Sequence, residues 1–366
     1  MTSQMAREVA EQPTAVRRTL EAVMPQRQAV RDLARGRRRV LFAARGSSDN
    51  AAVYGRYLLE VHAGVPGGLV SPSVATHYRS RLDLSDALVV SVSQSGATEE
   101  IVATQEWAHG CGAATVAVAN VAGSPLVGAA DLALVTRAGP ERAVPATKTY
   151  LTQLVALAVL ATALAPDPAA LDGELDRVAG EIERLLAARA GVDAAVAALH
   201  DADHAVVSGR GLMLGTALET ALKLEETCLR PVRGYSYADL RHGPISVVTS
   251  GVTAVLVAAP GGPLLAPMTE LAGDLAARGA TTVGIGGDAG FAAACSVWVP
   301  GPALPESVAP LGTMVPAQLV VEALARGLGL DPDNPRGLAK VTSTDPVGPV
   351  GRFGPVGPFD TRKEDT

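Results

Sequence analysis

The stretch that decides the fold is Ser91-Val92-Ser93-Gln94-Ser95-Gly96-Ala97-Thr98, which follows the apolar run Ala87-Leu88-Val89-Val90 and precedes a helical pattern from Glu99 to His109. A strand that passes through a Ser/Gly-rich turn into a helix exposes backbone N–H groups and hydroxyls, and the helix dipole there favours negative charge. No Gly-Lys-Ser/Thr follows, so the loop lacks the Walker pattern of nucleotide triphosphate sites. The loop predicts a site for a single phosphate monoester; the alternative is an ordinary strand-to-helix turn.

Apolar runs typical of strands alternate with helical patterns along the chain, which favours parallel sheets with right-handed crossovers. Hydrophobic residues make up 48% of the chain but aromatic residues only 3%, so the core must consist mainly of Ala, Val and Leu. We therefore expect an α/β fold in which each parallel sheet is flanked by helices, as in flavodoxin. The expected strands are 39–44, 89–93, 114–119, 131–136, 205–208, 252–258, 281–286 and 296–299. The expected helices are 48–63, 98–109, 145–165, 171–199, 213–229, 263–278 and 315–327.

Each half of the chain opens with a strand, a turn containing arginine and glycine, and a helix. The segment Phe42 to Ser48 corresponds in this way to Val206 to Gly211, which indicates an internal duplication with two pseudo-twofold related domains. We expect an N-terminal helical segment, a first domain, a connecting helix, a second domain and a C-terminal tail, at residues 1–36, 37–166, 167–200, 201–330 and 331–366 respectively.

The composition limits the binding partners and the cellular compartment that we expect. The formal net charge of −6 argues against nucleic-acid binding as the main task. The three cysteines, Cys111, Cys228 and Cys295, lie too far apart for a disulfide framework or a metal knuckle. Reduced thiols of this kind fit a cytoplasmic protein.

The sequence predicts neither a secretory signal nor a membrane-spanning segment. Residues Met1 to Glu11 are polar and charged, so we expect no secretory signal. The most apolar run, Tyr150 to Ala165, contains Thr152 and Gln153, which favours a buried core helix over a membrane span.

Three charged residues recur at helical spacing in an apolar, alanine-rich segment. Glu219, Lys223 and Glu226 lie at i, i+4 and i+7, which places them on one face of the predicted helix 213–229. A Glu–Lys pair four residues apart is also the commonest surface salt bridge. The apolar surroundings make a partly buried, functional row the stronger interpretation.

Two further candidates follow the predicted helix 213–229 in the sequence. His242 is followed directly by Gly243-Pro244, so it belongs to a tight loop, where a catalytic histidine is more often found. Lys340 lies in an extended segment after Asn334-Pro335, where a surface lysine is the simpler interpretation when the segment is taken alone. The remaining histidines have no metal-ligand spacing, so we expect no metal and no cofactor; they are His62, His77, His109, His200 and His204.

Taken together, these segments resemble the double sugar-isomerase (SIS) domain family. The closest resemblance is to the isomerase half of glutamine–fructose-6-phosphate aminotransferase and to stand-alone amino-sugar-phosphate deaminases. Four motifs carry it in order: Ser93-Gln94-Ser95-Gly96-x-Thr98, Ala217-Leu218-Glu219-x-Ala221-Leu222-Lys223-Leu224-x-Glu226, His242-Gly243-Pro244 and Pro335-Arg336-x-Leu338-Ala339-Lys340.

The resemblance implies a phosphosugar site and a role for each matching residue. Glu226 matches the general base between C1 and C2, Lys223 a lysine near the enediol oxygen, and Glu219 lies one turn earlier. His242 matches a ring-opening histidine that completes the neighbouring subunit's site, which implies a homodimer, and Lys340 matches a Schiff-base lysine. The implied substrate-binding residues are Ser47, Ser48, Ser93, Gln94, Ser95, Thr98, Val144 and Ala339.

Three departures from the family pattern bear on the activity. No cysteine precedes Cys111, so we expect no release of ammonia from glutamine. Ala146 stands where the family has a substrate-contacting serine, and Arg233 replaces a carboxylate close to His242. The sugar and the group displaced from it are therefore left open by the sequence.

Simple chemistry supports proton transfer independently of the resemblance. An open-chain 2-amino sugar has an acidic C2 proton, and one carboxylate, one cation and one histidine suffice to move it. Reprotonation at C1 and imine hydrolysis would give a ketose phosphate and ammonia. Loss of the C3 hydroxyl of the N-acetylated sugar would instead make the protein a dehydratase, and a third alternative is a non-catalytic sugar-phosphate sensor.

Overall fold

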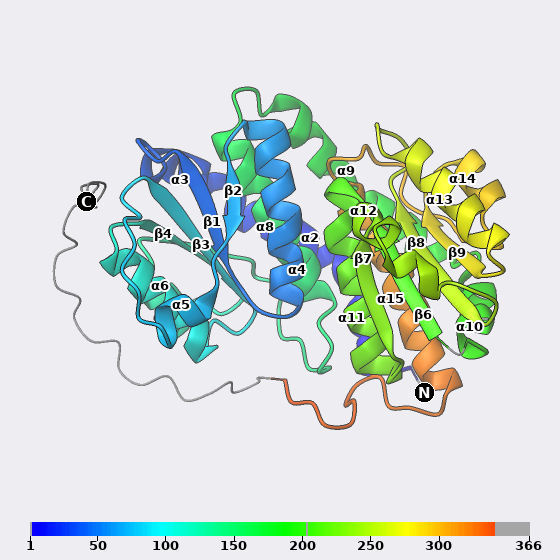
Figure 1. Ribbon diagram of the computed structural model, residues 1–366. Helices are drawn as coiled ribbons and strands as arrows, with labels where there is room; N and C mark the ends of the chain where they lie inside the picture. Colours follow the sequence, from blue (N-terminus) through cyan, green and yellow to red (C-terminus); the bar gives the residue numbers. More distant parts are fainter. Residues whose placement is uncertain (1, 203, 341–366) are drawn as a thin grey trace, which may run out of the picture.

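Two parallel sheets, one in each half of the chain, form the framework of a computed structural model that describes residues 2–202 and 204–340 (Figure 1). The first sheet has the strand order β2-β1-β3-β4-β5 and the second the order β10-β9-β8-β6-β7. The two orders are the same when each half is counted from its own first strand, so the α/β fold with an internal repeat is confirmed. The strands are β1 Arg39–Ala43, β2 Gly67–Leu69, β3 Ala87–Ser93, β4 Ala114–Ala119, β5 Leu132–Val135, β6 His204–Gly209, β7 Val232–Ser236, β8 Val252–Ala258, β9 Thr281–Gly286 and β10 Val297–Val299.

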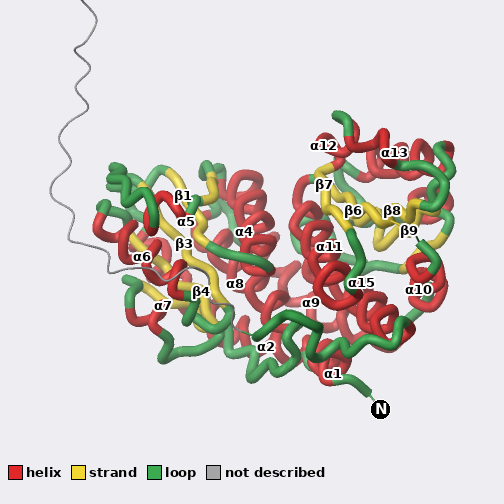
Figure 2. The backbone as a smooth tube through the Cα atoms, turned by 60° about the horizontal axis from the view of Figure 1, so that its bottom comes forward, coloured by secondary structure: helices red, strands yellow, loops and turns green. Residues whose placement is uncertain are grey.

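Helices cover both faces of each sheet (Figure 2). In the first half α5 (Pro72–Thr76), α6 (Glu99–Gly110) and α7 (Pro125–Gly128) form one layer, and α4 (Ser47–Leu58) and α8 (Lys148–Leu164) form the other. In the second half α13 (Leu265–Ala277) and α14 (Ala289–Ala294) oppose α10 (Val192–His200), α11 (Leu214–Cys228) and α15 (Ala309–Gly327). The remaining α-helices of the described residues are α1 (Gln4–Ala10), α2 (Gln12–Val23), α3 (Arg27–Leu33), α9 (Ala169–Ala188) and α12 (Tyr237–Arg241).

The inner helices of the two halves pack against each other and share one apolar core. Helix α4 contacts α11, α8 contacts α15, and α2 packs on both α8 and α9. Helix α8 is buried from Lys148 to Ala163, and its Leu, Val and Ala side chains join residues of both sheets in one cluster. No described helix is long and apolar enough to cross a membrane.

One close approach fixes how α4 meets α11. A Cβ atom at Gly215 would lie 2.6 Å from the backbone oxygen of Asn50, so only glycine permits this crossing. The first turn of α4 thus lies along α11, where Asn50 reaches Glu219 and Ser47 reaches Lys223, although these residues are more than a hundred positions apart in sequence.

The structure corrects the single helix expected at 171–199. The chain forms α9 and α10 instead, because Arg189 (φ 41°) and Gly191 (φ 76°) adopt left-handed backbone conformations that turn it between the two helices. Helix α15 begins at Ala309, six residues before the expected start, and includes Pro316 in its interior.

Strands β2 and β7 were absent from the sequence-based expectation. Both are edge strands, and each contains glycine rather than a continuous apolar run: Gly67-Gly68-Leu69 in β2, and Arg233-Gly234 in β7. An edge strand has only one paired neighbour and one protected side, so its sequence need not carry the apolar signature of a central strand.

Candidate active site

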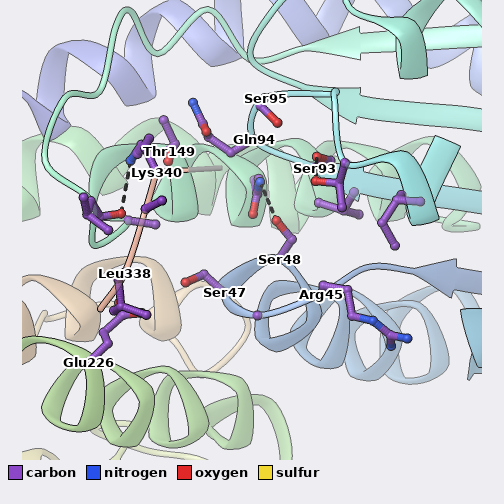
Figure 3. Close-up of a pocket in the computed structure, with 18 of the residues that line it drawn as sticks. Arg45, Ser47, Ser48, Ser93, Gln94, Ser95, Thr149, Glu226, Leu338 and Lys340 are labelled. Carbon is purple, nitrogen blue, oxygen red and sulfur yellow. Dashed lines mark hydrogen bonds between the residues drawn. The ribbon is translucent and has the colours of Figure 1, made fainter. Parts of the chain in front are cut away.

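A cavity of about 370 Å³ lies at the carboxyl ends of β1 and β3, between the first sheet and α11 of the second half. Figure 3 shows Ser93, Gln94 and Ser95 on one side of it, Glu226 on the other, and Ser47 and Ser48 between them. The cavity is lined by Arg45, Gly46, Ser47, Ser48, Val92, Ser93, Gln94, Ser95, Thr98, Ile101, Val144, Ala146, Thr149, Gln153, Lys223, Glu226, Leu338, Ala339 and Lys340. The structure thus brings together every residue expected to bind substrate.

The conformation of the hydroxyl-rich loop between β3 and α6 is stabilised by hydrogen bonds within the loop. Gly96 N–H donates to Ser93 Oγ at 3.2 Å, and the Ser93 and Thr98 hydroxyls are 3.2 Å apart. Gly96 has φ 62°, and a Cβ atom there would lie 2.1 Å from Ser124 Oγ, so the turn requires glycine. The hydroxyls and the first turn of α6 face one cavity, which suits an anion.

The start of α4 supplies a second group of hydroxyls. Ser48 Oγ accepts a hydrogen bond of 3.0 Å from Gln153 on α8, and Ser47 Oγ accepts one of 3.1 Å from Lys223 on α11. Arg45 forms two hydrogen bonds of 2.9 Å with the carboxylate of Glu100 on α6, which ties the β1 loop to the β3 loop.

The charged row on α11 is buried rather than a surface salt bridge. The side chains of Glu219 and Lys223 are 0% and 1% exposed, whereas that of Glu226 is 19% exposed and reaches the cavity. Lys223 Nζ lies 3.2 Å from Glu219 Oε1 and also bonds Glu226 Oε1. Asn50 on α4 donates a 2.9 Å hydrogen bond to Glu219, which does not itself line the cavity.

The electrostatics of this row follow from burial and from the two carboxylates. Burial raises the pKa of Glu219, and the nearby Lys223 charge opposes the rise without cancelling it. Burial alone would lower the pKa of Lys223, but Glu219 and Glu226 outweigh it and raise that pKa. An ammonium group with a raised pKa therefore lies next to the partly exposed Glu226 side chain.

Lys340 is held at the cavity by a residue that the sequence analysis missed. Its Nζ donates to Glu141 Oε2 at 2.8 Å and to the backbone oxygen of Ala143 at 2.7 Å. Glu141 is fully buried and also accepts hydrogen bonds from the backbone N–H groups of Thr147 and Thr149. Burial would raise the pKa of Glu141, but the charge of Lys340 and these bonds lower it below its ordinary value.

The segment that carries Lys340 is fastened to the loop after β5 and to the N-terminal helix α1. The Val144 N–H donates to the backbone oxygen of Asp333 at 2.8 Å. The Asp333 carboxylate accepts from the N–H groups of Gln4 and Met5 at 2.8 and 2.7 Å, in the first turn of α1. We call residues 331–340 the C-terminal strap.

His242 is the expected catalytic residue that the single chain does not bring to the cavity. It follows α12, is exposed to solvent and is absent from the cavity lining. Arg233 is also exposed and lies over Tyr235, with its guanidinium 5.2 Å from the ring centroid. Within one chain Arg233 therefore does not add a cation to the cavity, whereas Ala146 does line it in place of a hydroxyl.

Four polar residues that line or support the cavity were not among the expected site residues: Arg45, Glu141, Thr149 and Gln153. The only local signal was polar side chains in otherwise apolar or irregular segments, such as Gln153 in the apolar run of α8. Among the described residues, no group of three or more His, Cys, Asp or Glu side chains is arranged to hold a metal.

Known proteins share both the sequence pattern and the fold. Over 346 residues the chain is 32% identical to glutamine–fructose-6-phosphate aminotransferase (isomerizing) of Pyrococcus horikoshii, a match that covers 93% of this chain and 58% of that protein. The chain spans less than two thirds of the length of such relatives. The C-terminal domain of glucosamine-fructose-6-phosphate aminotransferase from Francisella tularensis superposes with a TM-score of 0.84 at 27% identity, covering 91% of this chain and 99% of that one.

A structure from Silicibacter pomeroyi, provisionally named a phosphosugar isomerase, superposes with a TM-score of 0.82 at 34% identity and covers 91% of this chain and 100% of that one. Residues 33–163 and residues 198–326 each match the SIS domain. These two regions make up more than half of the chain, and each contains one of the two parallel sheets, so the protein belongs to the SIS domain family.

Proposed function

We propose that the protein is an amino-sugar-6-phosphate isomerase and deaminase that acts on glucosamine-6-phosphate or a close analogue. The observation that carries the proposal is the meeting, in one cavity, of the hydroxyl loop of the first repeat with the Lys223–Glu226 pair of the second. The names of the relatives, which act on fructose-6-phosphate or are called phosphosugar isomerases, support the same class of substrate.

In this proposal the substrate phosphate binds to the loop after β3. Ser93, Ser95 and Thr98 offer hydroxyls, and the adjoining backbone N–H groups and the first turn of α6 favour a dianion. Charge-assisted hydrogen bonds of this kind contribute about 1.5–3 kcal/mol each. The open-chain sugar would extend past Gln94, Ser47 and Ser48 toward Glu226, with Val144 and Ala339 forming the wall. All six residues line the same cavity.

The proton transfer uses the two charges on α11. Glu226 takes the proton from C2, and the Lys223 ammonium stabilises the enolate oxygen that forms at C1. Glu226 returns the proton to C1, and a proton passes from the amino nitrogen to the C1 oxygen, which leaves a C1 hydroxyl and an imine at C2. Water adds to that imine, the C–N bond breaks, and the products are a ketose 6-phosphate and ammonia. Glu219 is a positioning residue in this scheme, because it touches Lys223 and Asn50 but not the cavity.

Lys340 and His242 have separate proposed roles. Lys340 lines the cavity and would contact the open-chain carbonyl, with Glu141 holding its ammonium until the substrate arrives. His242 would open the sugar ring in the site of a second subunit, which makes the active unit at least a homodimer. Its exposure on the surface of one chain is compatible with that role.

The decisive experiment measures product and exchange on three substrates. The protein is incubated with glucosamine-6-phosphate, with its N-acetyl form, and with fructose-6-phosphate plus ammonia, and deuterium exchange at C2 is followed in heavy water. We expect ammonia and a ketose phosphate from the first substrate and the reverse reaction from the third. An unsaturated product from the N-acetyl sugar without ammonia would make the protein a dehydratase, and binding without exchange would make it a sensor; either result contradicts the proposal.

A matched pair of variants assigns the base. Glu226→Gln should abolish C2 exchange, whereas Glu225→Gln should leave it unchanged, because Glu225 is exposed and lies outside the cavity lining. Equal exchange in the two variants would remove Glu226 from the mechanism.

Subunit complementation tests the role of His242. Inactive Glu226→Gln and His242→Ala proteins are dissociated, mixed and reassembled. If His242 acts across the interface, a mixed dimer regains one intact site and activity returns. No recovery despite demonstrated subunit exchange would place His242 outside the neighbour's site.

A further inference from the structure

A second cavity, of about 530 Å³, lies between α1, α2 and the loop that follows β5, away from the proposed active site. Three arginines from these three segments line it: Arg7, Arg18 and Arg142. The rest of the lining is small or neutral except for one carboxylate, that of Glu11. Its volume exceeds that of the active-site cavity, so it has room for a small organic molecule rather than only an inorganic ion.

The charges of this second cavity are unbalanced. Within residues 2–202 and 204–340 no carboxylate lies within ion-pair distance of Arg7, Arg18 or Arg142. The one lining carboxylate, Glu11, is already paired with the buried ammonium of Lys148. The three arginines are exposed to solvent, and Arg7 donates a 2.9 Å hydrogen bond to the backbone oxygen of Thr2. Their planar donor arrays match phosphate oxygens.

The second cavity is linked by direct bonds to the strap that carries Lys340. Arg142 is adjacent in sequence to Glu141, which holds Lys340, and the Arg142 N–H donates to Glu8 on α1 at 2.6 Å. The first turn of α1 in turn binds the carboxylate of Asp333 in the C-terminal strap. A ligand that draws α1 and the Arg142 loop together would therefore stabilise both attachments of the strap.

We propose that the cavity formed by Arg7, Arg18 and Arg142 binds a phosphate-bearing small molecule, and that its occupancy stabilises the docked C-terminal strap. The site is distinct from the first cavity, because the two cavities share no lining residue. The site does not depend on which reaction the first cavity performs.

The test uses inorganic pyrophosphate as the probe and calorimetry as the readout. A Ser93→Ala/Ser95→Ala background weakens binding in the first cavity, so that the remaining heat reports on the second. In that background Arg18→Gln/Arg142→Gln should weaken pyrophosphate binding about tenfold or more, since two charge-assisted contacts are lost.

The matched control is Arg17→Gln/Arg137→Gln, which removes the same charge from neighbouring positions that do not line the cavity. It should change the affinity less than about twofold, the size of a screened long-range effect. Equal weakening in both double variants, or no weakening in either, would overturn the proposed site. Thermal unfolding of each variant confirms that it is folded.

Backbone hydrogen exchange tests the link to the strap. Saturating pyrophosphate should slow exchange of the Gln4, Met5 and Val144 amides, which donate to Asp333, and should not do so in Arg18→Gln/Arg142→Gln protein. Unchanged exchange of these three amides in the protein that binds pyrophosphate would refute the coupling. Neither readout requires catalytic activity, so failure of this inference is distinguishable from failure of the proposed function.

Discussion

Replacing Lys340 by methionine should destabilise the protein strongly, and more so as the pH rises. Glu141 is fully buried and is ion-paired with Lys340, so the variant leaves a buried carboxylate without its cation. Loss of one partner of a buried pair costs about 3–5 kcal/mol. The Lys340 side chain is one quarter exposed, and Glu141 keeps its bonds to Thr147 and Thr149, so we expect the lower end, about 3 kcal/mol near neutral pH.

The direction of the pH dependence follows from the pKa of Glu141. In the wild type this pKa is lowered from its ordinary value of 4.5, so the ionised group contributes stability above that pH, and the contribution is lost as the pH falls through the folded-state value. Without Lys340 the largest cause that lowers this pKa is lost, so we expect the pKa of Glu141 to be higher in the variant than in the wild type. The difference in unfolding free energy between wild type and variant then grows as the pH rises between the two folded-state pKa values, by about 1.4 kcal/mol for each unit that separates them.

The assay is urea unfolding of wild type and variant at about pH 5 and about pH 7.5, where the difference in unfolding free energy should be larger at the higher pH. Lys340→Arg keeps the charge and should lose much less stability than Lys340→Met. Arg17→Met, which breaks the exposed pair with Glu183, should cost less than about 1 kcal/mol. The same loss for Lys340→Met at both pH values would show that Glu141 does not depend on Lys340, and would refute the reasoning.

Four further outcomes test the cavity and its framework. Ser93→Ala/Ser95→Ala should raise the KM for a 6-phosphate substrate by about tenfold or more, and an unchanged KM in steady-state kinetics would move the phosphate elsewhere. Glu226→Gln should lower kcat by about 10²–10⁴-fold with substrate binding retained, as measured by turnover and calorimetry. Gly215→Ala should lower the unfolding free energy by about 1–3 kcal/mol because its Cβ would meet the Asn50 oxygen at 2.6 Å. Gly180→Ala, in an exposed helical position with no atom within 4 Å of the added Cβ, should stabilise the protein by about 0.5–1 kcal/mol.

The parts of the fold that the sequence predicts are those with a strong periodic signal. The central strands β3 and β8 are continuous apolar runs and were identified, because both faces of each are covered by helices. The edge strands β2 and β7 carry no such run. The break between α9 and α10 depends on two left-handed residues, and Arg189 gives no sequence signal for that conformation.

The site residues divide in the same way. Some belong to local sequence motifs, and others depend on contacts between distant parts of the chain. The loop after β3 and the row on α11 are contiguous motifs, so spacing alone points to them. Glu141 acquires its place only when the C-terminal strap returns across the chain, since its partner Lys340 is 199 residues away in sequence. Gln153 reaches Ser48 across 105 residues in the same way. A single sequence gives no local signal for such contacts between distant residues.

The two repeats have the same strand order but unequal cavities, which explains why a duplicated chain would hold one site. In the first repeat the loop after the central strand is rich in hydroxyls and leaves an open cavity. In the second repeat the space after β8 is reduced to about 10 Å³ by Leu264 and Glu306, and Arg210 lies over the Tyr237 ring at 4.5 Å. The second repeat instead turns its helix α11 toward the first, where Gly215 allows close contact with α4. In the proposed function, one repeat thus binds the phosphate and the other supplies the base, so neither half would act alone.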